Sequence, residues 1–323
     1  MNIGLIDVDG HSKFPNIPLM KLARWHKNRG DNVEFYSVFG NYDIVYMSKV
    51  FTFTNDYRYA MPNAKKIVRG GTGYDYKIRL PEEVDHLQPD YSIYPFIDTR
   101  TAYGKLTIGC QNKCAWCIVP KKEGMIKPYM DIEEIAIDGR NKIVLFDNNL
   151  LAINDYAMMQ FEKIIRHGFR IDLNQGNDAR LMTRETAKIM SQVKWINNMI
   201  RFGCDTKSQI EPCLKALEWL CEFGFKGKVE MYTMIHGNLH ECYERISFWR
   251  NVNFKGITVR CQSQPKLDFT KTRQNIPRWA KDMARWSNRK ELYASIDFKE
   301  YIPRKGFTCS EYFKSGNLMY DSM

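Results

Sequence analysis

The stretch that organises this 323-residue chain reads Gly109-Cys110-Gln111-Asn112-Lys113-Cys114-Ala115-Trp116-Cys117. Its three cysteines follow the spacing C-x3-C-x2-C, and the other six cysteines form no second tight group. Three thiolates on one short loop can converge on a metal ion or cluster. A closed zinc or iron–sulfur site takes four protein ligands, so three ligands favour a cluster with one open iron.

Two alternatives stay open on spacing alone. A distant Cys or His would complete a structural zinc site. The three thiols would otherwise be buried as small apolar side chains without any metal.

The triplet resembles C-x3-C-x-Φ-C, the signature of radical S-adenosylmethionine enzymes, with Trp116 at the aromatic position. In that family the three cysteines hold a [4Fe-4S] cluster, and the fourth iron chelates S-adenosylmethionine. Reduction of the cluster cleaves this cofactor to methionine and a 5′-deoxyadenosyl radical, which abstracts hydrogen from a substrate. The resemblance implies that Cys110, Cys114 and Cys117 are the cluster ligands, that Trp116 lies at the cofactor, and that a flavodoxin- or ferredoxin-type protein donates the electron.

Composition sets the broad class. Hydrophobic residues make up 44% of the chain, enough for a sizeable core, while the mean hydropathy of −0.47 and the lack of long apolar runs argue against a membrane protein. The first residues lack the basic flank and apolar core of a signal peptide. Nine cysteines without a dense framework fit a reducing compartment, so we expect a cytoplasmic protein.

The formal net charge is +11, and almost all of the excess lies after residue 100. A basic face can hold nucleic acid or an anionic substrate. The alternative is an ordinary solvated surface, because the basic residues form no long run.

Residues 1–98 are predicted to form a Rossmann-like domain with a parallel sheet. Apolar runs predict strands at 2–8, 33–38, 43–48 and 66–69, and a helical stripe covers 15–29. Gly70-Gly71-Thr72-Gly73 lacks the spacing of a nucleotide-binding loop, so a turn is favoured over a phosphate cradle. The domain resembles the cobalamin-binding type, but Asp9-Gly10-His11 and the residues that follow do not complete its D-x-H-x-x-G motif. We therefore expect no cobalamin.

Residues 99–266 contain six strand–helix repeats. The predicted strands cover 103–108, 142–146, 169–173, 196–202, 228–235 and 256–260, and the predicted helices cover 154–167, 183–193, 208–223 and 239–250. Polar residues follow each strand, and in β/α barrels ligands bind at that end. The count is similar to the partial (βα)6 barrel, a TIM-type arrangement, of the radical S-adenosylmethionine core.

The resemblance assigns cofactor contacts to polar residues at the strand ends, by position in the family's motifs. These residues are Asp147, Asn148, Asn149, Gln175, Asp178, Arg180, Arg201, Asp205 and His236. Each has an ordinary structural alternative, because such residues also cap helices and form ion pairs. Cys204 and Cys261 are predicted to end strands near the same edge but are left outside the site.

Residues 267–323 form a basic extension. Trp279, Met283 and Trp286 share one face of a predicted helix. We favour a helix that closes the open side of the barrel over an aromatic–basic surface that stacks on bases.

The sequence therefore predicts an α/β radical S-adenosylmethionine enzyme with an unidentified substrate. The rivals are a zinc-containing nucleic-acid-binding protein and an electron-transfer iron–sulfur protein. An RNA modifier of the methylthiotransferase type is a more specific option, but it would need a second cysteine triplet that this chain lacks.

Overall fold

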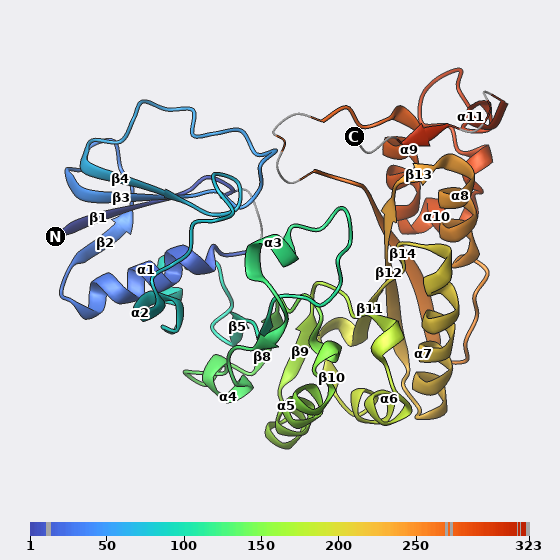
Figure 1. Ribbon diagram of the computed structural model, residues 1–323, viewed down its shortest axis with the longest axis horizontal. Helices are drawn as coiled ribbons and strands as arrows, with labels where there is room; N and C mark the ends of the chain where they lie inside the picture. Colours follow the sequence, from blue (N-terminus) through green and yellow to red (C-terminus); the bar gives the residue numbers. More distant parts are fainter. Residues whose placement is uncertain (11–13, 269–270, 272–273, 315, 317, 321–323) are drawn as a thin grey trace. The chain divides into compact units, whose positions relative to one another are not determined.

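The computed structural model describes residues 1–10, 14–268, 271, 274–314, 316 and 318–320. The chain divides into two compact units. One contains Met1–Tyr103 and Asp268–Gln274, and the other contains Gly104–Leu267 and Asn275–Met323. Both are built from parallel strands with helices, which confirms the predicted α/β class (Figure 1).

The first unit has a four-stranded sheet in the order β2-β1-β3-β4 with every pair parallel. Its elements are β1 (Asn2–Asp7), α1 (Ile17–Asn28), β2 (Asn32–Phe35), β3 (Tyr42–Ser48), β4 (Ala64–Gly70) and α2 (Glu82–Asp85). Helix α1 begins after Asn16, whose side chain accepts a hydrogen bond from the Leu19 amide. This is the Rossmann-like layer that the sequence predicts.

The glycines after β4 have a structural explanation. A Cβ at Gly71, where φ is +92°, would lie 2.3 Å from the Lys49 carbonyl oxygen, and the Gly73 amide donates to that oxygen at 2.8 Å. The loop therefore turns tightly over the backbone at Lys49, and only glycine fits there. His11, part of the cobalamin motif comparison, lies outside the described residues.

The second unit contains the six repeated strands in chain order. They are β5 (Thr101–Gly104, which spans the division between the units), β8 (Lys142–Leu145), β9 (Arg170–Leu173), β11 (Met199–Gly203), β12 (Gly227–Ile235) and β14 (Ile257–Pro265). The sheets run β10-β9-β8-β5 and β11-β12-β14, with the short β10 (Lys194–Trp195) on the edge of the first. A parallel bridge between Asn177 and Phe202 joins the end of β9 to β11.

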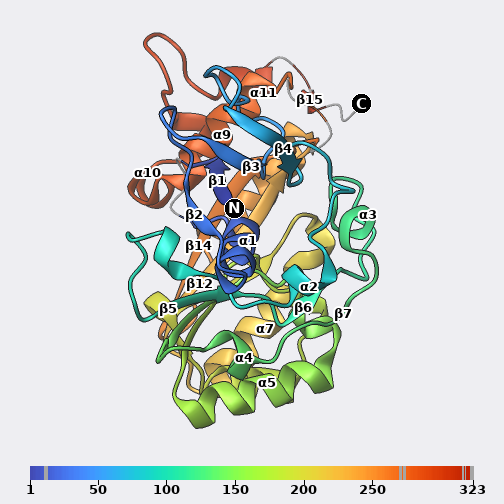
Figure 2. The same cartoon turned by 90° about the vertical axis from the view of Figure 1, so that its left-hand side faces the viewer.

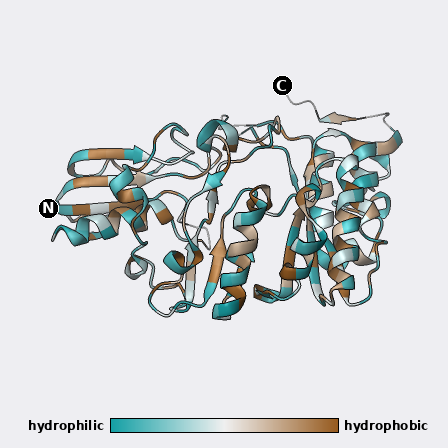
Figure 3. Ribbon diagram, turned by 60° about the horizontal axis from the view of Figure 1, so that its bottom comes forward, coloured by the Kyte–Doolittle hydropathy of each residue, from teal (hydrophilic) through white to brown (hydrophobic). Residues whose placement is uncertain are grey.

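Helices pack against these strands. They are α4 (Ile132–Ile135), α5 (Asn154–His167), α6 (Arg184–Met190), α7 (Ile210–Glu222) and α8 (Leu239–Phe248), followed by α9 (Arg278–Asn288), α10 (Lys290–Ser295) and α11 (Glu311–Lys314). The remaining short pieces are β6 (Thr107–Ile108), α3 (Val119–Glu123), β7 (Lys127–Pro128), β13 (Gly237–Asn238) and β15 (Met319–Tyr320). Hydrophobic residues concentrate along the strands, whereas the helices alternate between polar and apolar faces (Figure 3).

Several predicted strands differ from the structure. The strand predicted at 33–38 ends at Phe35, and the strand predicted at 196–202 begins only at Met199, because Ile196–Asn198 form a 3₁₀ turn. The strand predicted at 103–108 is interrupted between β5 and β6 (Figure 2). The last strand does not stop at Arg260 but continues to Pro265, because β12 pairs with it along its whole length, up to Ile235 opposite Pro265. Cys261 therefore lies buried within β14, and the prediction that it ends a strand is wrong.

Helix α6 begins at the predicted cap. The Thr183 hydroxyl accepts a hydrogen bond from the Thr186 amide at 3.1 Å. Replacing Thr183 by alanine leaves that amide without its partner and is expected to lower the free energy of unfolding by about 1 kcal/mol. Urea denaturation measures the change, and an unaltered midpoint would show that the cap contributes nothing.

The tail helix α9 packs on β14. The side-chain amide of Asn288 donates to the Ser263 carbonyl at 2.8 Å, and its oxygen accepts from the Ser263 amide at 2.7 Å. Trp279 and Trp286 are 3% and 0% exposed. Their rings are not available to stack on nucleic-acid bases, so that alternative for this helix is wrong.

Candidate functional site

The cysteine loop connects β6 to α3 and is closed at its base by hydrogen bonds. The Cys110 amide donates to the Gly124 carbonyl at 3.1 Å, and the Gly109 amide donates to the Glu123 carboxylate at 3.0 Å. Gly109 has a φ of +85°, and a Cβ there would lie 2.3 Å from the Met125 carbonyl oxygen. The loop can therefore close this tightly only with glycine at this position.

The three cysteine thiols of the loop are close enough to influence one another's pKa. Cys110 is buried, and Cys114 and Cys117 are half-buried. Burial raises the pKa of both half-buried thiols, and the neighbouring cysteines and Asp205 raise it further. Metal binding must therefore displace these protons, as it does at other thiolate sites.

The donor set fits a cluster better than a single ion. Among the described residues, no three His, Cys, Asp or Glu side chains converge closely enough to hold one metal ion. A four-iron cluster binds each cysteine on a different iron, so its ligands need not meet at one point.

Asn149 adds a second observation at the same loop. Its side-chain nitrogen lies 3.9 Å from the Cys110 sulfur. Its side-chain oxygen is buried and has no hydrogen-bond partner within the described chain. Such an oxygen is costly unless a donor from a bound group satisfies it, so Asn149 fits a cofactor beside Cys110.

The loop after β9 is tied directly to the cysteine loop. Asn112 donates to the Asp178 carboxylate at 2.9 Å, and Arg180 pairs with the same carboxylate at 2.8 Å and 2.6 Å. Burial alone would raise the pKa of Asp178, but the bonds from Arg180 and Asn112 hold it below its usual range. The positive charge of Arg180 also acts to lower the pKa of the Cys114 thiol, against the larger effect of burial.

Trp116 and His236 come together although they are far apart in sequence. Their ring centroids are 4.6 Å apart at an angle of 35°. The His236 ring also lies 3.0 Å from the Asp205 carbonyl oxygen, and the Asp205 carboxylate accepts from the Met234 amide at 2.7 Å. Three predicted cofactor residues thus form one cluster at the ends of β11 and β12.

The residues after β8 have different roles. Asp147 is buried, and its oxygens accept hydrogen bonds from the Leu106 and Thr107 amides and the Thr107 hydroxyl. This carboxylate organises β6 below the cysteine loop. Asn148 donates to Glu123 at 2.7 Å, so it supports the base of that loop.

Two predicted residues lie away from this cluster. Arg201 is buried on β11, where it forms ion pairs with Asp172 on β9 and Glu230 on β12. Gln175 is exposed in the loop after β9.

Sequence reasoning missed Asn112 and Glu123. Glu123 accepts hydrogen bonds from the Gly109 amide and the Asn148 side chain, and it pairs with Lys105 at 2.8 Å. Lys105 and the Gly109 amide hold the pKa of Glu123 below its usual range despite burial. Asn112 had a visible signal, its place inside the cysteine motif. Glu123 had none, because its partners are distant in sequence.

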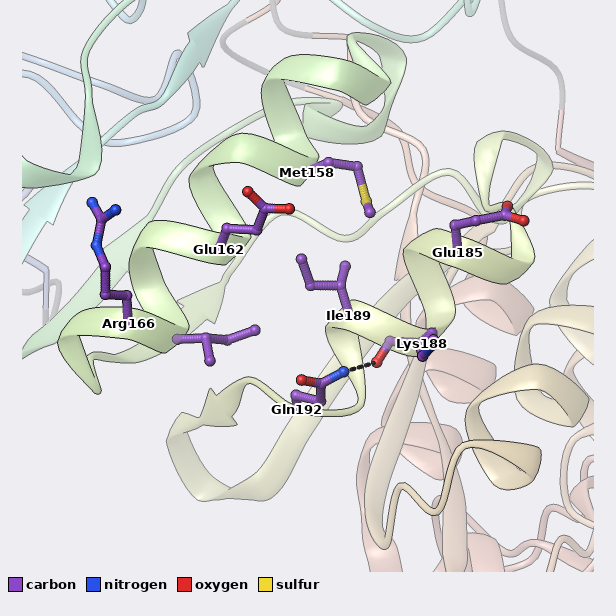
Figure 4. Close-up of a pocket in the computed structure, with 8 residues that line it drawn as sticks. Met158, Glu162, Arg166, Glu185, Lys188, Ile189 and Gln192 are labelled. Atoms are coloured by element: carbon purple, nitrogen blue, oxygen red, sulfur yellow. Dashed lines mark hydrogen bonds between the residues drawn. The ribbon is translucent and has the colours of Figure 1, made fainter.

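A groove on the outer helices is unrelated to these residues. It has a volume of about 430 Å³ between α5 and α6 and is lined by Met158, Glu162, Arg166, Glu185 and Lys188, among others (Figure 4). Its lining comes from helix surfaces rather than strand ends, where barrel ligands bind.

Comparisons with known proteins support the resemblance. No protein-family model matches the chain. It is 22% identical over 153 residues to the ribosomal protein uS12 methylthiotransferase RimO of Syntrophotalea carbinolica, covering 45% of this chain and 29% of that protein. It is 38% identical over 85 residues to the tRNA-2-methylthio-N(6)-dimethylallyladenosine synthase of Nitratiruptor, covering 23% of this chain and 19% of that protein. The chain thus spans less than a third of these relatives.

The fold is similar to that of TsrM from Kitasatospora setae, a radical S-adenosylmethionine methyltransferase solved with cobalamin and a [4Fe-4S] cluster. The TM-score is 0.52 at 12% identity, covering 76% of this chain and 71% of that one. A second structure of TsrM, with tryptophan and a S-adenosylmethionine analogue, matches equally well. These comparisons confirm the similarity to radical S-adenosylmethionine enzymes. No helix in the described ranges has the length and apolar character needed to cross a membrane.

Proposed function

We propose that this chain is a radical S-adenosylmethionine enzyme, with Cys110, Cys114 and Cys117 as the ligands of a [4Fe-4S] cluster. The cluster supplies the electron that cleaves S-adenosylmethionine to methionine and the 5′-deoxyadenosyl radical that abstracts hydrogen. The observation that carries the proposal is three thiols on a closed loop beside the unpartnered oxygen of Asn149. The similarity to known enzymes of this kind supports it.

The surrounding residues would position the cofactor. The Asn149 oxygen is available to accept from an amino group, and a buried acceptor of this kind favours a donor strongly. Arg180 would offer its charge to a carboxylate, because 47% of its side chain is exposed despite the pair with Asp178. The Trp116–His236 pair would provide an aromatic face for the adenine.

Three of the predicted residues receive a supporting role in this proposal. Asp147 accepts a hydrogen bond from the Thr107 amide before the cysteine loop, and Asn148 donates to Glu123 after it, so both stabilise the base of the loop. Arg201 serves the stability of the strands through its ion pairs.

We assign no substrate to the proposed hydrogen abstraction. The two relatives are named for methylthio transfer to a ribosomal protein and to tRNA. This chain has no second cysteine triplet to hold a further cluster as a sulfur source. We propose hydrogen abstraction from an unidentified substrate, with a flavodoxin- or ferredoxin-type electron donor and without cobalamin.

Electron paramagnetic resonance tests the proposal. The protein is reconstituted anaerobically, reduced with dithionite and measured at low temperature with and without S-adenosylmethionine. We expect a reduced [4Fe-4S] signal that shifts when the cofactor is added. A cluster signal that does not change when S-adenosylmethionine is added would indicate an electron-transfer protein. Stoichiometric zinc in place of iron would contradict the radical mechanism.

A further inference from the structure

The first unit contains a cavity that the proposed function does not use. It lies at the carboxyl ends of β1 and β2 and has a volume of about 560 Å³. In parallel α/β sheets this edge is where ligands bind, and the volume is within the usual range for small-molecule sites. The described residues that line it all belong to the segment 5–96.

Six of the thirteen described lining residues are aromatic. Tyr94 contacts Phe35 on one side and Phe96 on the other, with ring centroids 5.3 Å and 5.4 Å apart. Tyr59 makes an edge contact with Tyr57 at 5.3 Å. Tyr59 and Phe96 are 74% and 62% exposed, so two large rings at the mouth are left open to solvent. Exposed aromatic surface of this kind often marks a binding site.

The floor carries one fixed carboxylate. Asp7 accepts from the Tyr94 hydroxyl at 2.7 Å and from the Asn16 amide at 3.4 Å, and the Asp9 amide also bonds to it. Asn16 is itself held by Ser48 at 2.9 Å. A carboxylate offers about four acceptor positions, so Asp7 keeps room for one more donor.

The charge of the described wall is unfavourable for an anion. None of the described lining residues is a lysine or arginine, and Asp7 is the one acidic group among them. Among these residues a phosphate or other anion would meet a carboxylate with no compensating cation. A purely aliphatic ligand would leave the last acceptor position of Asp7 buried without a donor.

We propose that this cavity binds a planar heteroaromatic base that carries an N–H donor, a purine in a nucleoside or in single-stranded RNA. The ring would stack on the aromatic wall, which is how proteins hold unpaired bases. Its amino group would donate to Asp7. The proposal does not depend on the cysteine loop, which lies in the other unit.

Calorimetric titration of the full-length protein tests the proposal, with guanosine and with purine riboside, which lacks the exocyclic and ring N–H donors. We expect guanosine to bind about tenfold more tightly than purine riboside. Tyr59→Ala should weaken guanosine binding about tenfold, because it removes one stacking ring.

The matched control is Phe39→Ala. Phe39 is 94% exposed in the same unit but does not line the cavity, so its loss should leave guanosine binding unchanged. An oligouridine that contains a single guanosine tells a nucleoside ligand from an RNA ligand. If the oligomer binds more tightly than free guanosine and salt weakens its binding, the site is assigned to RNA. If the two bind equally, the site is assigned to a nucleoside. The proposal is overturned if neither probe binds, if both variants behave alike, or if hydroxocobalamin binds here and guanosine does not.

Discussion

Replacing Cys114 by alanine is expected to abolish both the reduced-cluster signal and the formation of 5′-deoxyadenosine. The half-buried thiol of Cys114 lies within electrostatic reach of Cys110 and Cys117, and these three would be the protein's only ligands to the cluster. With two thiolates left, the cluster loses one of its three attachments to the chain. Iron content after anaerobic reconstitution and product analysis after reduction measure the two losses.

The matched control is Cys221→Ala. Cys221 is also half-buried, but it lies on α7 and its sulfur contacts the Lys255 carbonyl rather than the site. This variant should keep the iron content and the product yield of the unchanged protein. A Cys114→Ala variant with full iron content, still making 5′-deoxyadenosine, would contradict the assignment of the three ligands.

The sequence predicted the fold well because its signals are local. Apolar runs and helical stripes located the six repeated strands, although the first is split and several ends differ, and helix α5 has the predicted limits, 154–167. The cysteine motif is also local, since its spacing fits within eight residues. The end of β14 was misjudged because its polar residues continue a strand only through pairing with β12, which the sequence alone does not reveal.

The polar strand ends were harder to interpret. Asp147 and Asn149 are two residues apart in sequence, yet they have different partners. The Asp147 carboxylate accepts a hydrogen bond from the Thr107 amide, whereas the Asn149 side chain contacts the Cys110 sulfur. These partners are 40 and 39 residues away. Whether a polar residue after a strand faces a ligand or supports the backbone therefore depends on long-range contacts that no local pattern encodes.

Arg201→Met is expected to destabilise the second unit strongly. Arg201 is 7% exposed and pairs with two carboxylates, the buried Asp172 on β9 and the half-buried Glu230 on β12, the latter at 3.2 Å. Removing the cation leaves two negative charges facing each other in a poorly solvated space. Breaking a buried pair from one side typically costs about 3–5 kcal/mol of folding free energy.

The folding free energy lost in the Arg201→Met variant should depend on pH. Burial already raises the pKa of Asp172, and Arg201 acts against that rise. Without Arg201 the pKa rises further, so the folded variant binds a proton more tightly than the unfolded chain does. The stability deficit of the variant should therefore shrink as the pH falls from neutral into the acid range.

Urea denaturation followed by tryptophan fluorescence measures this change, because six of the seven tryptophans lie in the second unit and only Trp25 lies in the first. The matched control is Arg184→Met, which removes an arginine from an exposed pair with Glu222. Exposed pairs contribute little, so its urea midpoint should stay nearly unchanged. If Arg201→Met and Arg184→Met shift the midpoint equally, or if acid does not narrow the deficit, the buried charges are not what stabilises these strands. If both expectations hold, Arg201 is a residue that supports the strands, and its place at the predicted cofactor edge is a consequence of that structural role.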